Sequence, residues 1–536
     1  MESANRQYPY PSRRMVGYAR RGMVATSQNL AAEAGLAVLR QGGNAVDAAV
    51  AAAAALTVLE PTSNGIGGDA FALILYQGRL YGLNASGPAP TALSASTLSD
   101  RGFTSMPRWG WPPVTVPGAP RAWADLCRRF GRLSLSRCLQ SAIDYAEGGY
   151  PVSPVLAYGW EHAFNTYRRY LVGQEFAPWF DTFAPQGRAP AEGEIWRSPN
   201  HARTLRSIAD SGADDFYLGD LADRIDAFSR AHGGFLRKSD LTAFQAQWVD
   251  PVRTTYRGYD IWELPPNGQG VIALMALNIL SHFELEQRET VDTYHYQIEA
   301  LKLAMTDGQA AITDPRWMPA DLVDTWLSSA YAETKSAAIS QRALDPGPAH
   351  FTGGGTVYLA TADAQGNMVS YIQSNYMGFG SGLVVPGTGI ALQNRGHLFS
   401  VNPAAANFLE PGKRTYHTII PAFLGKDGQY LGPFGVMGGL MQPQAHLQVA
   451  SNIIDFQLNP QSALDAPRWQ WVEGNRVVVE PEVAPWLIDG LGARGHHVVK
   501  LSERGSFGRG QVILRNAEGV LLGGTEGRAD SGLACW

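Results

Sequence analysis

The chain has 536 residues, of which 45% are hydrophobic and 17% charged, and its formal net charge is −5. This composition, without a long low-complexity tract, predicts a soluble globular protein with a large core. Lysine and arginine total 43 against 48 acidic residues, and no basic cluster alternates with aromatic residues along the chain. Because proteins that follow a nucleic-acid backbone usually carry such clusters, we expect a small-molecule partner and no nucleic acid.

Membrane and export signals are weak in this sequence. The arginine pairs at 13–14 and 20–21 are not followed by a sustained apolar stretch of the signal-peptide type. The longest apolar run, 48–59, is alanine-rich and about half the length of a membrane-spanning helix. The three cysteines show neither metal-ligand spacing nor an even disulfide framework. We expect no membrane association and a cytoplasmic location, with the periplasm as the alternative.

The first elements are predicted from caps and turns. A helix over 31–40 should end at Gly42-Gly43, and a second, buried helix should follow Asn44, with Asp47 completing a capping box. Short apolar runs at 70–76 and 79–84 flank a tight turn and predict a hairpin. The glycines before it resemble half of a dinucleotide fingerprint. They follow a helix and precede a strand, however, so a tight turn is the better interpretation.

The middle of the chain, about 115–335, has mainly helical patterns. His295 and Glu299 lie one turn apart there, but no further ligand has metal-site spacing, so we interpret them as an exposed helix pair. A connection rich in glycine and proline should follow over about 333–355. No metal or cofactor motif is found along the chain, and neither group is expected.

Thr356 begins a second predicted hairpin. The runs 356–363 and 367–374 flank a three-residue loop that ends in Gly366. If the hairpin closes around this loop, the numbers of any two residues that face each other add up to 730. Ser374 should therefore lie opposite Thr356, unless a bulge intervenes. The sequence therefore places a second hydroxyl beside Thr356.

A threonine hydroxyl needs a neighbouring base, and a free α-amino group on the same residue can supply one. The peptide bond between Gly355 and Thr356 must then be cut. The glycines at 353–355 suit such a cut because they tolerate a strained backbone. On this pattern alone, an ordinary glycine-rich loop entering a strand is the better interpretation.

Two further glycines, Gly438 and Gly439, stand between a predicted strand and a helix that opens near Pro443. Backbone N–H groups at such a junction can stabilise the oxyanion of a tetrahedral intermediate. A simple turn is the alternative interpretation.

Several long motifs occur together and in a fixed order. They are 22–27 (GMVATS), 38–49 (VLRQGGNAVDAA), 60–69 (EPTSNGIGGD), 116–119 (VPGA), 411–414 (PGKR) and 467–469 (PRW). With these motifs the chain resembles the γ-glutamyltransferase family of N-terminal nucleophile hydrolases over nearly its whole length. The resemblance implies an α+β fold, a four-layer αββα sandwich with a helical large-subunit region.

The resemblance also implies function. It implies a precursor that cleaves itself into a large subunit, 1–355, and a small subunit, 356–536, which form a heterodimer or a dimer of such heterodimers. By motif position, Thr356 matches the family's nucleophile, Ser374 the hydroxyl that orients it, and Gly438 with Gly439 the oxyanion hole. The substrate would be a small-molecule amide.

The expected glutamyl pocket is altered. The family's carboxylate-binding arginine has no counterpart in 84–90 (NASGPAP), and its two adjacent serines correspond to His417 and Thr418. Its ammonium ligands correspond to Tyr376 and to Arg395 in the segment 395–398 (RGHL), which also holds His397. Arginine binds carboxylates through two parallel hydrogen bonds, so these residues favour an anionic acyl group. A structural role is the alternative for each of them.

Three functions stay open on the sequence. The first is a threonine amidohydrolase with non-glutamyl specificity, of the kind that acts on oxamate-like or other acyl amides. The second is a true γ-glutamyltransferase or glutathione hydrolase. The third is an unprocessed, non-catalytic binding homologue, because many relatives have aspartate where this chain has Gly355.

Overall fold

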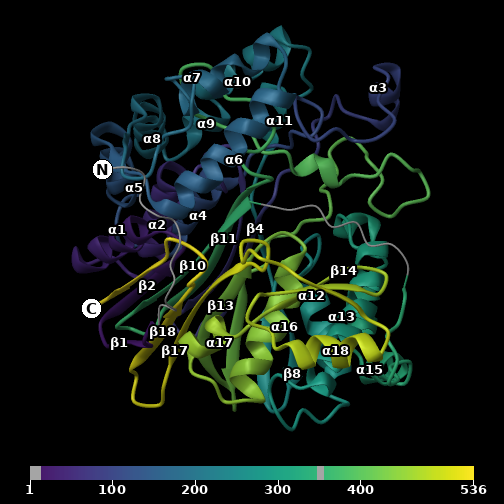
Figure 1. Ribbon diagram of the computed structural model, residues 1–536. Coiled ribbons are helices and arrows are strands. Elements are labelled where there is room, and N and C mark those ends of the chain that lie inside the picture. The colour runs from purple at the N-terminus through teal and green to yellow at the C-terminus, as the bar shows by residue number, and fades with distance from the viewer. Residues whose placement is uncertain (1–13, 347–354) are drawn as a thin grey trace.

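The computed structural model describes residues 14–346 and 355–536. Two seven-stranded antiparallel sheets lie face to face, and helices cover the outer face of each (Figure 1). This arrangement confirms the α+β class and the four-layer αββα sandwich. None of the described helices is both long and apolar enough to span a bilayer.

The first sheet has the two strands of the Thr356 hairpin near its centre. Its strand order is β19 (Gly532–Cys535), β2 (Gly22–Thr26), β10 (Gly355–Asp363), β11 (Met368–Tyr376), β3 (Asp69–Tyr76), β4 (Arg79–Ala85) and β7 (Gln247–Val249). Four helices pack on its outer face: α1 (Asn29–Arg40), α2 (Ala45–Leu59), α4 (Ala119–Phe130) and α5 (Leu135–Gly148).

Helix α2 forms as its sequence predicts. Asn44 accepts hydrogen bonds from the N–H groups of Val46 and Asp47, and the Asp47 carboxylate accepts one from the Asn44 N–H. Every residue from Ala45 to Leu59 is buried, and the small alanine side chains let α1 and the sheet approach closely. The early hairpin is confirmed as β3 and β4.

The second sheet has the strand order β1 (Gly17–Ala19), β18 (Leu521–Thr525), β17 (Arg509–Arg515), β13 (Gln429–Met437), β12 (Ala422–Lys426), β9 (Tyr259–Glu263) and β8 (Val252–Tyr256). Its outer face is covered by α12 (Gly270–Leu280), α13 (Val291–Ala311), α16 (Met441–Ile454) and α17 (Pro460–Asp465). Between the two sheets lies a core that includes Phe71, Tyr358, Ile372, Phe423 and Ile513. This core fixes the strand ends on which the candidate site is built.

The remaining elements surround this sandwich. Most helices of the first half gather beyond α4 and α5 (Figure 1): α6 (Pro154–Tyr170), α7 (Ala177–Phe183), α8 (Pro199–Ser211), α9 (Asp214–Tyr217), α10 (Asp220–Ala231) and α11 (Lys238–Ala243). Helix α3 (Ala95–Asp100) stands apart from this group. The others are α14 (Leu322–Trp326), α15 (Ser329–Ser336), α18 (Pro485–Ala493), β5 (Tyr150–Pro151), β6 (Ile195–Trp196), β14 (Trp469–Glu473), β15 (Arg476–Val479), β16 (His497–Lys500) and the 3₁₀ turns η1 (Gln174–Phe176), η2 (Pro315–Trp317) and η3 (Arg395–Leu398).

Two sequence expectations about the middle region need correction. The region is mainly helical, but β7, β8 and β9 interrupt it, because short strands without strict alternation give little periodic signal. The connection before Thr356 begins later than expected, since α15 continues to Ser336. Glycines 353 and 354 of the expected cleavage loop lie outside the described residues.

Candidate active site

Thr356 and Ser374 lie side by side on β10 and β11. The Thr356 Oγ1–H donates to Ser374 Oγ at 3.0 Å, and the Ser374 Oγ–H donates to the Gly355 carbonyl oxygen at 2.7 Å. The hydroxyl oxygen of Ser374 also accepts from the Tyr376 N–H at 2.7 Å. Both hydroxyl residues are buried. Ser374 therefore connects Thr356 to the carbonyl of the peptide bond that precedes it.

The register of this hairpin agrees with the sequence arithmetic and adds a bulge. Val357 pairs with Gln373 and Ala362 with Met368, as the expected sum of 730 requires. Gly355 pairs with Tyr376 instead, so one extra residue of β11 is accommodated beside Thr356. Tyr376 accordingly has a positive φ of 77°, which is unusual for a residue with a side chain.

Gly438 and Gly439 form the turn between β13 and α16. Their φ angles are +145° and +61°, conformations that residues with side chains rarely adopt. Gln269 holds the turn in place because its Nε2 donates to the Gly439 carbonyl at 2.9 Å and to the Thr418 carbonyl at 2.7 Å. The helix expected near Pro443 begins at Met441, in agreement with the sequence.

Arg395 is fully buried beside the Tyr376 ring. Its guanidinium carbon lies 4.5 Å from the ring centroid, and its Nη1 donates to Thr418 Oγ1 at 2.6 Å. Its Nε and Nη2 groups have no hydrogen-bond partner among the described residues. Burial lowers the pKa of Arg395 to about 10, so the side chain stays charged at neutral pH. The fork therefore has two donor nitrogens, Nε and Nη2, left for another acceptor.

Asp69 and His417 lie close enough to Arg395 to feel its charge. His417 Nε2 donates to Asp69 Oδ2 at 3.1 Å, and both side chains are completely buried. Burial raises the pKa of Asp69 to about 7, although the positive charge of Arg395 opposes this rise. Burial, reinforced by Arg395, holds the pKa of His417 well below its usual value, so His417 is neutral. The charge of Asp69, and with it the field at Arg395, changes near neutral pH.

Several polar side chains in this neighbourhood were not identified from the sequence. Asn375 has neither amide atom hydrogen-bonded within the described part of the chain, and the same holds for Gln393 Oε1 and Gln442 Nε2. Gln393 Nε2 donates to Asp69 Oδ1 at 2.8 Å. Asn375 follows Ser374 directly, which is the one sequence signal that could have pointed to it. Buried polar atoms without partners are rare, and they gather here.

His397 lies apart from the residues just described. It is half-buried, and its Nδ1 hydrogen-bonds to the Met106 carbonyl at 2.9 Å. The described contacts thus join Tyr376, Arg395 and Thr418, with His417 next in sequence and bonded to Asp69. They do not include a contact between His397 and Arg395.

The expectation that His295 and Glu299 form an exposed pair is wrong. Both are buried, and His496, 201 residues away, hydrogen-bonds to His295 at 2.8 Å. The ligand atoms of His295, Glu299 and His496 could surround a metal ion. The Lys302 ammonium, however, already donates to Glu299 at 2.8 Å and neutralises its charge. Since tertiary contact and not local spacing brings His496 here, sequence periodicity could not find it.

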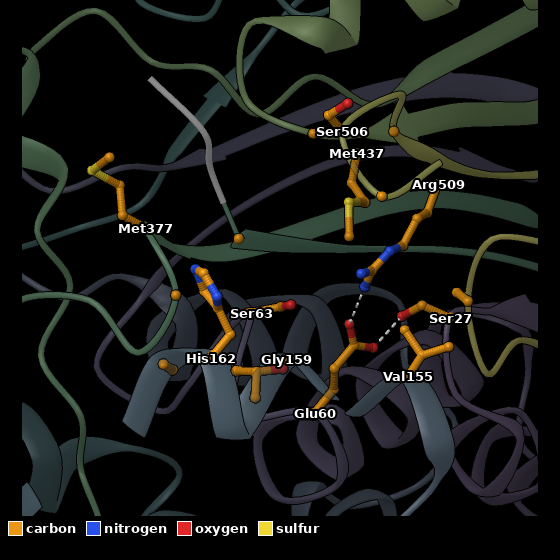
Figure 2. A pocket seen from close by; sticks show the side chains of 18 of the residues that line it. Ser27, Glu60, Ser63, Val155, Gly159, His162, Met377, Met437, Ser506 and Arg509 are labelled. Carbon is orange, nitrogen blue, oxygen red and sulfur yellow. Dashed lines mark hydrogen bonds and ion pairs between the residues drawn. The ribbon is translucent and has the colours of Figure 1, made fainter. Parts of the chain in front are cut away.

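A cavity of about 650 Å³ is lined in part by Gly355, the residue that precedes Thr356 (Figure 2). Gly355 and Gly438 both line it, whereas Arg395, His417 and Thr418 do not. Glu60 lies on its floor, where it accepts a hydrogen bond from Ser27 and faces Arg509 at 3.4 Å. Gly355 thus borders the open cavity directly, whereas Arg395 is fully buried and does not border it.

Comparisons with known proteins agree with this geometry. The family model described as gamma-glutamyltranspeptidase matches residues 31–536. The glutathione hydrolase-like YwrD proenzyme of Bacillus subtilis is 36% identical over 95% of this chain and 97% of its own length. The oxamate amidohydrolase proenzyme of Klebsiella pneumoniae is 33% identical over 96% of this chain and 98% of its own.

A solved structure extends the comparison to three dimensions. The crystal structure of cephalosporin acylase from Bacillus halodurans superimposes with a TM-score of 0.96 at 57% identity, and the match covers 99% of both chains. The strand layers, the hairpin at Thr356 and the matched family model lead to the same assignment. The chain belongs to the gamma-glutamyltranspeptidase family of N-terminal nucleophile hydrolases and transferases.

Proposed function

We propose that this protein is a self-processing threonine amidohydrolase that cleaves small amides whose acyl part carries a carboxylate. The proposal rests on two features: the Thr356–Ser374–Gly355 hydrogen bonds and the partly unpartnered guanidinium of Arg395. The names of relatives, which include an oxamate amidohydrolase and a cephalosporin acylase, support hydrolysis of amides other than γ-glutamyl ones.

Processing would begin at the Gly355–Thr356 bond. The Thr356 hydroxyl attacks the Gly355 carbonyl carbon, and the acyl group moves from the Thr356 nitrogen to its oxygen. Water then hydrolyses this ester and releases residues 1–355 and 356–536 as two subunits. The Ser374 hydroxyl already donates to the Gly355 carbonyl, so it can polarise the bond that breaks.

In turnover the new α-amino group of Thr356 acts as the base. It takes the hydroxyl proton while Oγ1 attacks the substrate carbonyl, and the N–H groups of Gly438 and Gly439 bind the oxyanion. The intermediate collapses, the proton passes to the departing amine, and an acyl ester stays on Thr356. Water activated by the same amino group hydrolyses that ester.

Arg395 would select the acyl group. The unpartnered Nε and Nη2 groups of this buried guanidinium match the two oxygens of a carboxylate, and Thr418 is a neighbouring polar contact. The α-ammonium of a glutamyl group would instead meet a positive charge in a partly dry pocket. Such repulsion costs on the order of several kcal/mol and should reduce binding by about a thousandfold.

The proposed boundary at 355/356 is compatible with a stable pair of subunits. Both sheets combine strands from before and after this bond: in the first, β10 and β11 lie between β2 and β3, and in the second, β18, β17, β13 and β12 lie between β1 and β9. Separation would expose the central strands of both sheets. The heterodimer should therefore persist after processing.

The test compares substrates on fully processed enzyme. A γ-glutamyl anilide and the anilides of short dicarboxylic acids share one leaving group, so kcat/KM reports the acyl pocket alone. We expect the dicarboxylic compounds to be preferred, Arg395→Gln to abolish that preference, and Arg395→Lys to restore part of it. A higher kcat/KM for the γ-glutamyl compound on the unaltered enzyme contradicts the assignment of Arg395.

A further inference from the structure

The large cavity does not reach the side chains proposed to bind the acyl carboxylate. Arg395 and Thr418 lie outside it, whereas Gly355 and Gly438 are among the residues that line it. While the acyl group stays bound to Thr356, the amine must depart and water must enter. An open space next to the reacting carbonyl is suited to that exchange, so under the proposed function it belongs to the leaving amine.

The size of the cavity argues against ammonia or a small alkylamine as the leaving group. One water molecule occupies roughly 30 Å³ in the liquid, and this cavity measures about 650 Å³. Ligand sites for drug-sized molecules fall in the same range. Apolar side chains line part of its wall: Leu156, Tyr167, Met377, Met437, Val472 and Leu501. The departing amine therefore has a bulky, largely apolar body.

The charges of the lining are unbalanced. Three arginines and His162 face two carboxylates, Glu60 and Asp530. Asp530 accepts hydrogen bonds from Ser153 Oγ and from the N–H groups of Val155 and Leu156, which cap helix α6. These hydrogen bonds hold the Asp530 carboxylate at the N-terminus of α6, which offsets its negative charge.

The second carboxylate, Glu60, also has its own partners. Glu60 is 5% exposed, accepts a hydrogen bond from Ser27 and pairs with Arg509. Burial raises the pKa of Glu60, which further reduces its negative charge. Neither carboxylate is available to the cations at the rim.

Two of the arginines keep their charge available. Arg108 is exposed and makes no ion pair among the described residues. Arg476 is exposed and lies only loosely, at 3.8 Å, from Glu473. They come from separate elements that line the cavity, one from the loop before α4 and the other from the start of β15. Figure 2 shows that His162 also points from α6 into this space.

We propose that this cavity binds a bulky amine leaving group that carries an anionic group, a carboxylate in the simplest case, with Arg108 and Arg476 as its specificity-determining contacts. The inference extends the proposed function from the acyl part of the substrate to its amine part. It predicts that the free amine product binds in the same place and inhibits competitively.

The experiment uses two substrates with one dicarboxylic acyl group and isosteric leaving groups, 3-aminobenzoate and 3-aminobenzamide. We expect kcat/KM for the carboxylate to exceed that for the carboxamide by about tenfold at low salt, mainly through KM. Salt should reduce the ratio because it screens exposed charges. The double variant Arg108→Gln, Arg476→Gln should bring it close to one. Arg168→Gln, an arginine of α6 outside the cavity lining, is the matched control and should keep the preference.

A binding measurement separates this inference from the proposed function. Calorimetry with free 3-aminobenzoate and 3-aminobenzamide requires no turnover and no acyl group. Tighter binding of the carboxylate, lost in the double variant but kept in Arg168→Gln, supports the anionic subsite even if neither anilide is hydrolysed. Equal binding of the two amines, or a preference that survives in the double variant, overturns it. Thermal unfolding of each variant checks that the chain is folded.

Discussion

At the scale of single residues, the candidate site depends on a hydroxyl group that is fully hydrogen-bonded and a guanidinium group that is not. Ser374 makes three hydrogen bonds at once, to Thr356, Gly355 and Tyr376. Arg395 uses only Nη1 within the described residues. Under the proposed function, the first group orients the nucleophile and the second binds an anion.

Replacement of Ser374 by alanine should leave a folded protein with much lower activity. We expect turnover to fall by about tenfold to a thousandfold, because Thr356 loses the oxygen that orients its hydroxyl. Ser370→Ala on the same strand is the control, since Ser370 contacts Tyr358 and not Thr356. The measurement is the steady-state turnover of the two folded variants. Equal turnover would show that Ser374 does not position the nucleophile.

Binding of an anionic product at Arg395 should depend on pH through Asp69. Its pKa is raised to about 7, so Asp69 is largely protonated at pH 6 and largely ionised at pH 8. Ionised Asp69 offsets the charge of Arg395, so the inhibition constant of a dicarboxylate product should fall as the pH is lowered from 8 to 6.

The control for this titration is Asp69→Asn, which cannot ionise and should give a flat profile. The inhibition constant is the right observable because kcat also reports the α-amino group of Thr356, which titrates near neutral pH. An unaltered enzyme with the same flat profile as Asp69→Asn would contradict the role given to Asp69.

The same pKa shift has a consequence for stability. Asp69 has a higher pKa in the folded than in the unfolded chain, so between pH 4 and 7 the folded state holds more of its proton. Its contribution is therefore most favourable at acid pH and is lost as the pH rises through about 7. Buried carboxylates of this kind usually occur where function requires them.

At the scale of elements, the site depends on how closely the turn before β3 approaches the end of β11. A Cβ added at Gly68 would lie 2.6 Å from the Ser374 carbonyl oxygen, and one at Gly67 would lie 2.4 Å from the Ala391 carbonyl oxygen. These glycines are thus needed for backbone packing beside Ser374, and the tight-turn interpretation of the sequence is confirmed.

Gly68→Ala should therefore slow self-cleavage by more than the loss of folding stability alone would explain. The new methyl group has to displace backbone at the end of β11, where Ser374 is held, so we expect at least about a tenfold slower self-cleavage. Gly148→Ala at the end of α5 is the control, because a Cβ there meets nothing within 4 Å. The rate at which the intact chain disappears on a denaturing gel gives the comparison. Equal rates would mean that this turn does not set the position of Ser374.

At the scale of the whole molecule, each of the two sheets contains strands from residues 1–355 and strands from residues 356–536. The sequence predicts local parts of this structure well: the capping box of α2, both hairpins and the register of the Thr356 hairpin all follow from spacing and turn length. It could not predict that Asp69 faces Arg395 or that His496 contacts His295, because pairs so distant in sequence leave no periodic pattern.

The candidate site likewise has some residues that the sequence predicts and others that it does not. Motif position indicates Thr356, Ser374, Gly438, Gly439 and Arg395, and their described contacts are compatible with the roles proposed for them. The unpartnered amide of Asn375 and the charge balance of the large cavity depend on three-dimensional packing alone. Both were therefore beyond the reach of sequence analysis.

The central claim, that Thr356 frees its own amino group, is tested most directly by intact mass and N-terminal sequencing of the purified protein. The account predicts two chains, the smaller beginning at Thr356 and ending at Trp536, and a single uncut, inactive chain for Thr356→Ala. Thr356→Ser should still yield two chains because the hydroxyl is kept. A single chain from the unaltered protein, a cut at another bond, or cleavage of the folded Thr356→Ala chain would contradict it.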